Sequence, residues 1–101
     1  MTTPAKAYLI AEVDVHDAAE FEAYRAAVAP MIAAFDGQYL VRGGAVTALE
    51  GDAPTTRMVV IECPSKAAAE TFWHSEEYAP VAAIRHASAH SRIFMVEGAP
   101  T

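Results

Sequence analysis

The apolar residues of this chain follow two different spacings, which together predict four strands and two helical regions. Short runs of branched and aromatic residues, typical of strands, occupy residues 7–15, 38–42, 57–63 and 91–97. Apolar residues three and four positions apart, typical of helices with one face on a core, occupy residues 18–36 and 66–90. The predicted order is strand, helix, strand, strand, helix, strand.

The ends of the two helical regions carry their own signals. Asp17 can accept backbone N–H groups at a helix start, and Gly37 suits the left-handed residue that ends a helix. Pro30 lies inside the first helix and predicts a kink rather than a break. Ser65 can cap the second region, and Ser75 offers another cap within it. We therefore expect the second region to form a bent or split helix.

A strand, helix, strand unit followed by its own copy predicts an α+β fold of the ferredoxin-like βαββαβ plan, with one antiparallel sheet and both helices on one face. Alternation along the strands then gives the sheet two largely apolar faces. We expect the helices to cover Leu9, Ala11, Val13, Leu40, Val59, Ile61, Ile93 and Met95. The open face would carry Tyr8, Ile10, Glu12, Tyr39, Val41, Met58, Val60, Glu62, Phe94 and Val96. Because soluble proteins seldom expose a large apolar face, the sequence predicts a homodimer in which two sheets face each other, a dimeric α/β barrel.

Composition limits the size of the core and the class of partner. We expect one domain over residues 1–101, with its core at about 7–98. Apolar residues make up 53% of the chain, but 23 residues are alanines, so large core side chains are few and assembly is favoured. A net charge of −6 and a pI near 5.0 disfavour nucleic acid as a partner. No apolar run reaches the roughly 18 to 20 residues of a membrane span, and the first residues lack a signal-peptide pattern, so we expect no membrane partner and a cytoplasmic location.

Several stretches recur in the order and at the distances of a known family. They are YLVRGG at residues 39–44, LEG at 49–51, VVIECPSKAAAETFWHSEEYAPV at 59–81 with Arg85 beyond it, and VEG at 96–98. Over roughly residues 7–98 the chain resembles the 1330 family of domains of unknown function. The resemblance implies the dimeric alpha-beta barrel superfamily, whose members include cofactor-free oxygenases, small-ring isomerases, haem-dependent enzymes and proteins with no known reaction. The family itself has no agreed activity.

One residue departs from the family pattern. Strand 57–63 ends in Cys63, where relatives tend to carry an aromatic residue, and the difference bears on local packing. A single cysteine cannot form an internal disulfide, so we expect Cys63 to be a small buried hydrophobe.

Arg42 is the first candidate for chemistry, because it ends a predicted strand and two glycines follow it. The glycines mark a bulge or a close approach of backbone before the chain continues extended. The guanidinium could hold a carboxylate or enolate oxygen, or it could pair with an acid such as Glu50 at the strand end. Tyr39 and Tyr8, both expected on the open face, could offer hydroxyls to a ligand or fill a dimer interface.

Glu12 and Glu62 are carboxylates within otherwise apolar strands. In an apolar cavity such a group has a raised pKa and can serve as a general acid or base. The two strands should be antiparallel neighbours, which places the carboxylates roughly 10 Å apart at about 3.3 Å per residue, so a shared-proton pair is not expected. Each could instead pair with an arginine in the dimer interior.

The histidines give weaker signals. His74 follows Trp73 and precedes Tyr78 in WHSEEY, so it could move protons at a pocket mouth, or it could close a helix by bonding a carbonyl. His86 and His90 have the spacing of a helical metal pair, but no HExxH-type acid accompanies them, and we expect no metal.

Two hypotheses of function follow. In the first, the barrel interior binds a small, mostly apolar molecule, and the protein is a cofactor-independent oxygenase or isomerase. In the second, a non-catalytic homodimer binds a metabolite or a protein partner. Catalysis would need a cavity of at least about 300 Å³ with convergent polar groups. The candidate catalytic residues are Arg42, Glu62 and His74, and the candidate ligand contacts are Tyr8, Tyr39, Trp73 and Tyr78.

Overall fold

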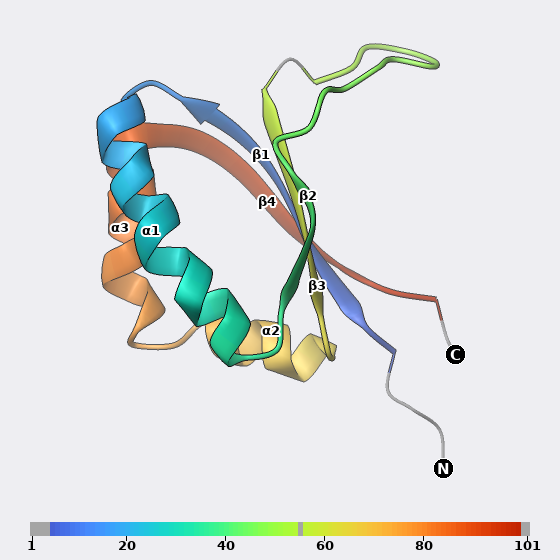
Figure 1. Ribbon diagram of the computed structural model, residues 1–101. Helices are drawn as coiled ribbons and strands as arrows, with labels where there is room; N and C mark the ends of the chain where they lie inside the picture. The colour runs from blue at the N-terminus through green and yellow to red at the C-terminus, as the bar shows by residue number, and fades with distance from the viewer. Residues whose placement is uncertain (1–4, 55, 100–101) are drawn as a thin grey trace.

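The described residues form one four-stranded sheet and three helices (Figure 1). The structure, a computed structural model, describes residues 5–54 and 56–99. The strands are β1 (Ala7–Val15), β2 (Gln38–Arg42), β3 (Arg57–Cys63) and β4 (Ala89–Glu97). The helices are α1 (Ala18–Ala34), α2 (Lys66–Trp73) and α3 (Tyr78–Ser88).

The strands lie in the order β2-β3-β1-β4, and each neighbouring pair is antiparallel. All three helices cover the same face of the sheet, and α1 packs against α3 (Figure 1). This arrangement confirms the predicted α+β fold of the ferredoxin-like plan. None of the described helices lies against the other face of the sheet.

Side chains at the helix ends account for where α1 and α2 begin. Asp17 Oδ1 accepts a hydrogen bond from the Glu20 N–H at 3.1 Å, and Ser65 Oγ accepts one from the Ala68 N–H at 3.1 Å. The left-handed residue after α1 is Asp36, with φ 66°, and not Gly37 as predicted. Aspartate tolerates this conformation better than most residues, because its short polar side chain can bond locally.

The second helical region is split, as the sequence predicted. Ser75 lies between α2 and α3, where its hydroxyl donates to the Phe72 carbonyl at 2.8 Å and accepts from the Tyr78 N–H at 3.2 Å. Strand β4 begins at Ala89, two residues before the predicted start. His90 is therefore on a strand, and the helical spacing assumed for His86 and His90 is wrong.

A bulge in β2 reverses the predicted orientation of one candidate residue. Tyr39 pairs with Ile61, but the register then shifts, so that Val41 pairs with Val60 and Arg42 with Val59. The residue between, Leu40, is the extra one, and it is 53% exposed. Tyr39 therefore faces the helices, and its predicted place on the open face is wrong. The bulge also brings Arg42 to that same helix-covered face, because residues three apart in a regular strand point to opposite faces.

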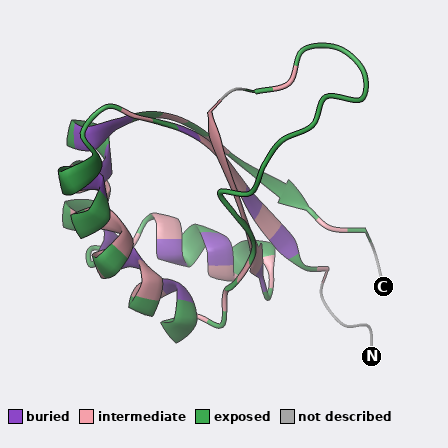
Figure 2. Ribbon diagram, turned by 45° about the horizontal axis from the view of Figure 1, so that its top comes forward, coloured by how far each residue is buried: buried purple, intermediate pink, exposed green. Residues whose placement is uncertain are grey.

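The core lies between the helices and the sheet (Figure 2). Its buried residues are Ala7, Leu9, Val28, Ile32, Cys63, Ala69, Phe72 and Tyr78. Cys63 is fully buried, as predicted, and burial followed by the neighbouring Glu62 charge raises the pKa of its thiol. The chain after Arg42 does not continue the strand as predicted, and it forms a loop that extends away from the sheet (Figure 1).

Apolar side chains also lie on the open face. Ile10 pairs with Val60 on one side and Phe94 on the other, and Val41 extends the row across β2. Val41 is 39% exposed and Phe94 is 48% exposed, so the isolated chain leaves this row partly in contact with water. The predicted apolar character of the open face is confirmed.

The two glycines after β2 provide a matched test of the local geometry. Gly43 has φ 81°, and a Cβ added there would lie 2.7 Å from Arg57 Cζ, whereas a Cβ on Gly44 would meet nothing within 4 Å. We expect Gly43→Ala to lower the free energy of unfolding by about 1–3 kcal/mol, because it strains the backbone and displaces Arg57. Gly44→Ala should change it by less than about 0.5 kcal/mol. Urea unfolding measures both, and equal losses would contradict the close approach at Gly43.

Candidate functional site

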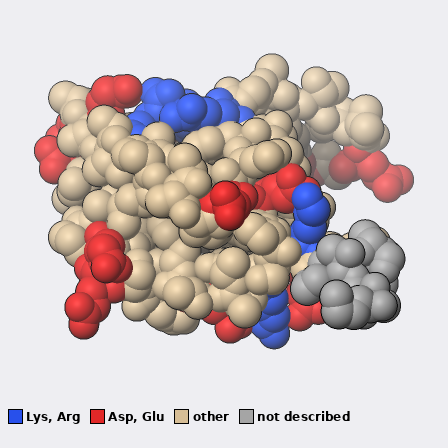
Figure 3. Space-filling view, turned by 60° about the horizontal axis from the view of Figure 1, so that its bottom comes forward, with Lys and Arg blue, Asp and Glu red and all other residues tan. Residues whose placement is uncertain are grey.

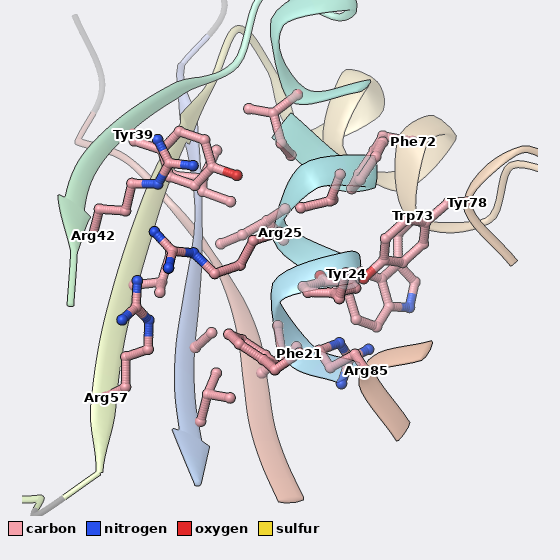
Figure 4. A pocket seen from close by; sticks show the side chains of 18 residues that line it. Phe21, Tyr24, Arg25, Tyr39, Arg42, Arg57, Phe72, Trp73, Tyr78 and Arg85 are labelled. Carbon is pink, nitrogen blue, oxygen red and sulfur yellow. Dashed lines mark hydrogen bonds between the residues drawn. The ribbon is translucent and has the colours of Figure 1, made fainter. Parts of the chain in front are cut away.

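A pocket lies between the helices and the sheet, on the covered face (Figure 4). The sequence predicted a ligand space on the other side, between facing sheets, so this pocket is in a different place. Its volume is about 70 Å³, well below the roughly 300 Å³ of typical drug-sized pockets. It is lined by Leu9, Ala11, Val13, Phe21, Tyr24, Arg25, Val28, Ile32, Tyr39, Arg42, Arg57, Val59, Ile61, Phe72, Trp73, Tyr78, Arg85 and Ile93.

Arginines dominate the charge of this pocket. The chain has five arginines, and four of them, Arg25, Arg42, Arg57 and Arg85, are in the lining, although the net charge of the protein is −6. No Asp, Glu or His from the described residues joins them. On the face in Figure 3 the acidic side chains are spread out, whereas much of the basic surface gathers at one edge. Four of the five arginines are therefore concentrated in one pocket, and among the described residues only Arg25 has a carboxylate partner there.

Three of the arginines gather beside β2 and β3 (Figure 4). Arg42 Cζ lies 4.4 Å from the centroid of the Tyr39 ring, a cation–π contact that the β2 bulge makes possible. Arg57 packs against Gly43, and Arg25 reaches in from α1 while its Nη1 contacts Glu22 Oε2 at 3.1 Å. Burial raises the pKa of Tyr39, and the nearby guanidinium groups partly oppose that shift.

Arg85 lies on the opposite side of the pocket, among aromatic rings (Figure 4). Arg85 is only 5% exposed, and its Nε is buried without a hydrogen-bond partner. Its Cζ lies 5.7 Å from the ring centroids of both Tyr24 and Trp73. Among the described residues, no carboxylate lies within the 4.0 Å of an ion pair with it. A buried charge without a counter-ion is costly, so this guanidinium is suited to an anion that arrives from outside.

A pair of tyrosine hydroxyls lies next to Arg85. Tyr24 Oη and Tyr78 Oη are 3.0 Å apart, and the Tyr78 ring lies 5.4 Å from that of Trp73. Burial, and then the Tyr78 hydroxyl, raises the pKa of Tyr24 well above its usual range, although Arg85 acts in the opposite direction. Tyr24 is therefore protonated at neutral pH, and it can donate a hydrogen bond to an acceptor in the pocket.

The structure brings together four of the seven predicted site residues. Arg42, Tyr39, Trp73 and Tyr78 all line the pocket. The other three, Tyr8, Glu62 and His74, are not in the lining.

Each of these three residues has another environment. Glu62 is on the open face, where its Oε1 lies 3.0 Å from Lys6 Nζ and where Tyr8 is its partner on β1. His74 caps the end of α2 through its backbone N–H and lines a separate hollow behind Trp73. Glu62 and His74 therefore cannot move a proton within this pocket as it stands.

Sequence reasoning missed four polar residues of the lining, namely Tyr24, Arg25, Arg57 and Arg85. The spacing of Arg85 was an available signal, since it lies seven residues after Tyr78 and four after Val81 on the inward stripe of α3. A charged residue on an apolar stripe is unusual unless it has a partner. Arg25 and Arg57 carried no comparable signal, because each lies near a boundary between exposed and buried positions.

Other candidate sites are sparse in the part of the chain that the structure describes. Glu12 Oε2 lies 3.8 Å from Nη1 of Arg92, its neighbour on β4, on the open face. The rings of His16 and His90 lie 5.1 Å apart, but within residues 5–54 and 56–99 no cluster of three metal-ligating side chains occurs. None of the described helices is long and apolar enough to cross a membrane.

Solved structures with the same fold come from several organisms. A protein of unknown function from Rhodopseudomonas palustris, RPA0582, superimposes with a TM-score of 0.77 at 17% identity, covering 99% of this chain and 87% of that one. SnoaB, a cofactor-independent oxygenase from Streptomyces nogalater, gives a TM-score of 0.62 at 19% identity, covering 96% of each chain. A monooxygenase-like protein from Caulobacter crescentus gives 0.67 at 17% identity, covering 97% of this chain and 93% of that one. At these identities the likeness shows the fold alone.

The sequence shows which family the chain belongs to. The sequence matches none of the curated proteins. Residues 6–99 match the family model described as "Domain of unknown function (DUF1330)", which is nearly the whole chain. The predicted resemblance is confirmed.

Proposed function

Since the chain belongs to the DUF1330 family of domains of unknown function, we propose its function from its own pocket. The protein binds a small organic acid between the helices and the sheet, and it does so as a homodimer. The single observation that carries this proposal is Arg85, a guanidinium 5% exposed whose Nε has no partner and which has no carboxylate beside it among the described residues.

The chemistry of a carboxylate fits this environment. A guanidinium presents its N–H groups as a planar fork that matches the two oxygens of a carboxylate, and it stays charged at all ordinary pH values. The hydroxyls of Tyr24 and Tyr78 lie on the same side of the pocket and can add a neutral donor. Hydrogen bonds to a charged group contribute about 1.5–3 kcal/mol each. Binding of an acid would therefore give the Arg85 guanidinium a counter-ion and lower the free-energy cost of its burial.

Pocket size and lining restrict the rest of the ligand. A volume of about 70 Å³ has room for a short acid and not for a large ring system. The rest of the lining is mostly aliphatic and aromatic, including Leu9, Val28 and Phe72. The predicted small apolar molecule is thus revised to a small molecule with an apolar body and an acidic head.

Catalysis is the second candidate function. The fold is shared with the cofactor-independent oxygenase SnoaB, and Arg85 with Tyr24 and Tyr78 could stabilise a developing oxyanion. However, Glu62 and His74 lie outside the pocket, and no other carboxylate or imidazole of the described residues lines it. A reaction here would need a substrate that loses its proton without a protein base. Binding without catalysis, the alternative drawn from the sequence, requires no such group.

The homodimer is supported by the open face of the sheet. The row Val41, Val60, Ile10 and Phe94 crosses the four strands, and none of the described helices lies against it. A second copy would cover this row sheet to sheet and remove its apolar area from water. The pocket lies on the other face, so each protomer would hold its own ligand.

Removing the buried charge tests the binding proposal. We expect wild-type protein to bind acetate, butyrate or benzoate in calorimetry, and Arg85→Met to bind the same acid at least about tenfold more weakly, because one charged contact is lost. Arg85→Lys, which keeps the charge without the fork, should fall between them. Lys66→Met removes an equal charge from an exposed position paired with Glu97 and should bind as wild type does.

Thermal melting without acid separates a binding role from a structural one. If Arg85 serves a ligand, Arg85→Met should melt no lower than wild type, because methionine replaces an unsatisfied buried cation with an apolar group of similar length. A large loss of stability in Arg85→Met would contradict the proposal. So would unchanged binding in that variant, or no binding of any of the three acids by wild type.

A charge on the open face tests the homodimer. Val60 is central in the apolar row, so Val60→Asp would place an unpaired carboxylate in the dimer interface. Light scattering should give twice the 10.8 kDa chain mass for wild type and the single mass for Val60→Asp. Thr71→Asp, which adds the same charge to the exposed side of α2, should remain dimeric. A monomeric wild type, or a dimeric Val60→Asp, would count against this interface.

A further inference from the structure

On the basis of the proposed function, we infer that the ligand is a short dicarboxylate with its two acidic groups at opposite ends. The arginines of the pocket form two separate groups (Figure 4). Arg25, Arg42 and Arg57 gather beside β2 and β3, and Arg85 lies across the pocket among Tyr24, Trp73 and Tyr78. A ligand that satisfies both groups needs a negative charge at each end.

The balance of charge leads to the same conclusion. Among the described residues, Arg25 has a partner in Glu22 at 3.1 Å, whereas Arg42, Arg57 and Arg85 have no carboxylate within ion-pair distance. Three positive charges therefore line one small volume without compensation. A monocarboxylate would leave two of them unbalanced, and a dicarboxylate leaves one, which lies on the exposed Arg42 side where water screens it.

The middle of the pocket favours a hydrocarbon spacer. The apolar part of the lining includes Leu9 and Ile61 from the sheet and Val28 and Phe72 from the helices, and none of these side chains can bond a polar atom. The volume of about 70 Å³ keeps the spacer short. The chemical class is thus an acid with a few methylene groups or a small ring between two carboxylates.

A single head with two charges, such as a phosphate monoester, is the main competing class. Its two charges could compensate Arg42 and Arg57, while Arg25 keeps its partner Glu22. It would leave Arg85 at the other side of the pocket, where Nε stays buried and unsatisfied. Arg85 therefore favours the two-ended acid over a phosphate head.

Matched pairs of acids test the inference by calorimetry on the full chain. Succinate, glutarate and adipate are each compared with the monocarboxylate of equal carbon number, namely butyrate, pentanoate and hexanoate, and propyl phosphate represents the single doubly charged head. We expect at least one dicarboxylate to bind about tenfold or more tightly than its monocarboxylate, since it gains a second charged contact. In Arg85→Met that advantage should disappear, while Lys66→Met should retain it.

The outcomes separate this inference from the proposed function. If monocarboxylates and dicarboxylates bind equally well and both depend on Arg85, the two-ended ligand is wrong and the binding of small acids stands. If propyl phosphate binds as tightly as the best dicarboxylate and is indifferent to Arg85→Met, the two-ended ligand is also wrong. If no acid binds wild-type protein that melts cooperatively, both the proposed function and the inference fail.

Discussion

A buried guanidinium without a counter-ion is the feature on which the rest of the site depends. Folding removes Arg85 from water and gives it two aromatic rings but no carboxylate among the described residues. Cation–π contacts contribute about 0.5–2 kcal/mol each, which offsets only part of the cost of burying a charge. The rest of this cost lowers the stability of the folded chain, as expected where a residue serves binding rather than stability. The other pocket arginines add to the same positive potential, which favours the binding of an anion in the pocket.

Small departures from regular backbone place these charges together. Without the bulge at Leu40, Arg42 and Tyr39 would point to opposite faces of the sheet, and one of the two would lie on the open face. Without a glycine at position 43, the Arg57 guanidinium could not lie where it does. The bulge and the glycine are both in or beside β2, the edge strand of the sheet, where irregularity disturbs only one neighbour. The edge of the sheet thus supplies the polar end of a pocket whose other walls come from a regular core.

Local patterns in the sequence were enough to predict the elements, their order, the caps at Asp17 and Ser65 and the two apolar faces. These features depend on nearby residues, so a single sequence reveals them. The side on which Tyr39 points could not be predicted, because strict alternation assumes a regular register and the bulge depends on pairing with β3. The location of the pocket also escaped prediction, since it depends on how far α1 stands from the sheet. Arg85 was visible as a charge on an apolar stripe, but its lack of a partner is a property of the folded chain.

The most direct test of the uncompensated charge is anomalous diffraction from crystals soaked in sodium bromide. Bromide is a small anion that needs no carboxylate geometry, so it reports the electrostatics of the pocket alone. We expect an anomalous peak inside the pocket, in contact with Arg85 or with the arginines beside β2. Bromide peaks only elsewhere on the surface, with the Arg85 guanidinium paired to a protein carboxylate, would contradict it.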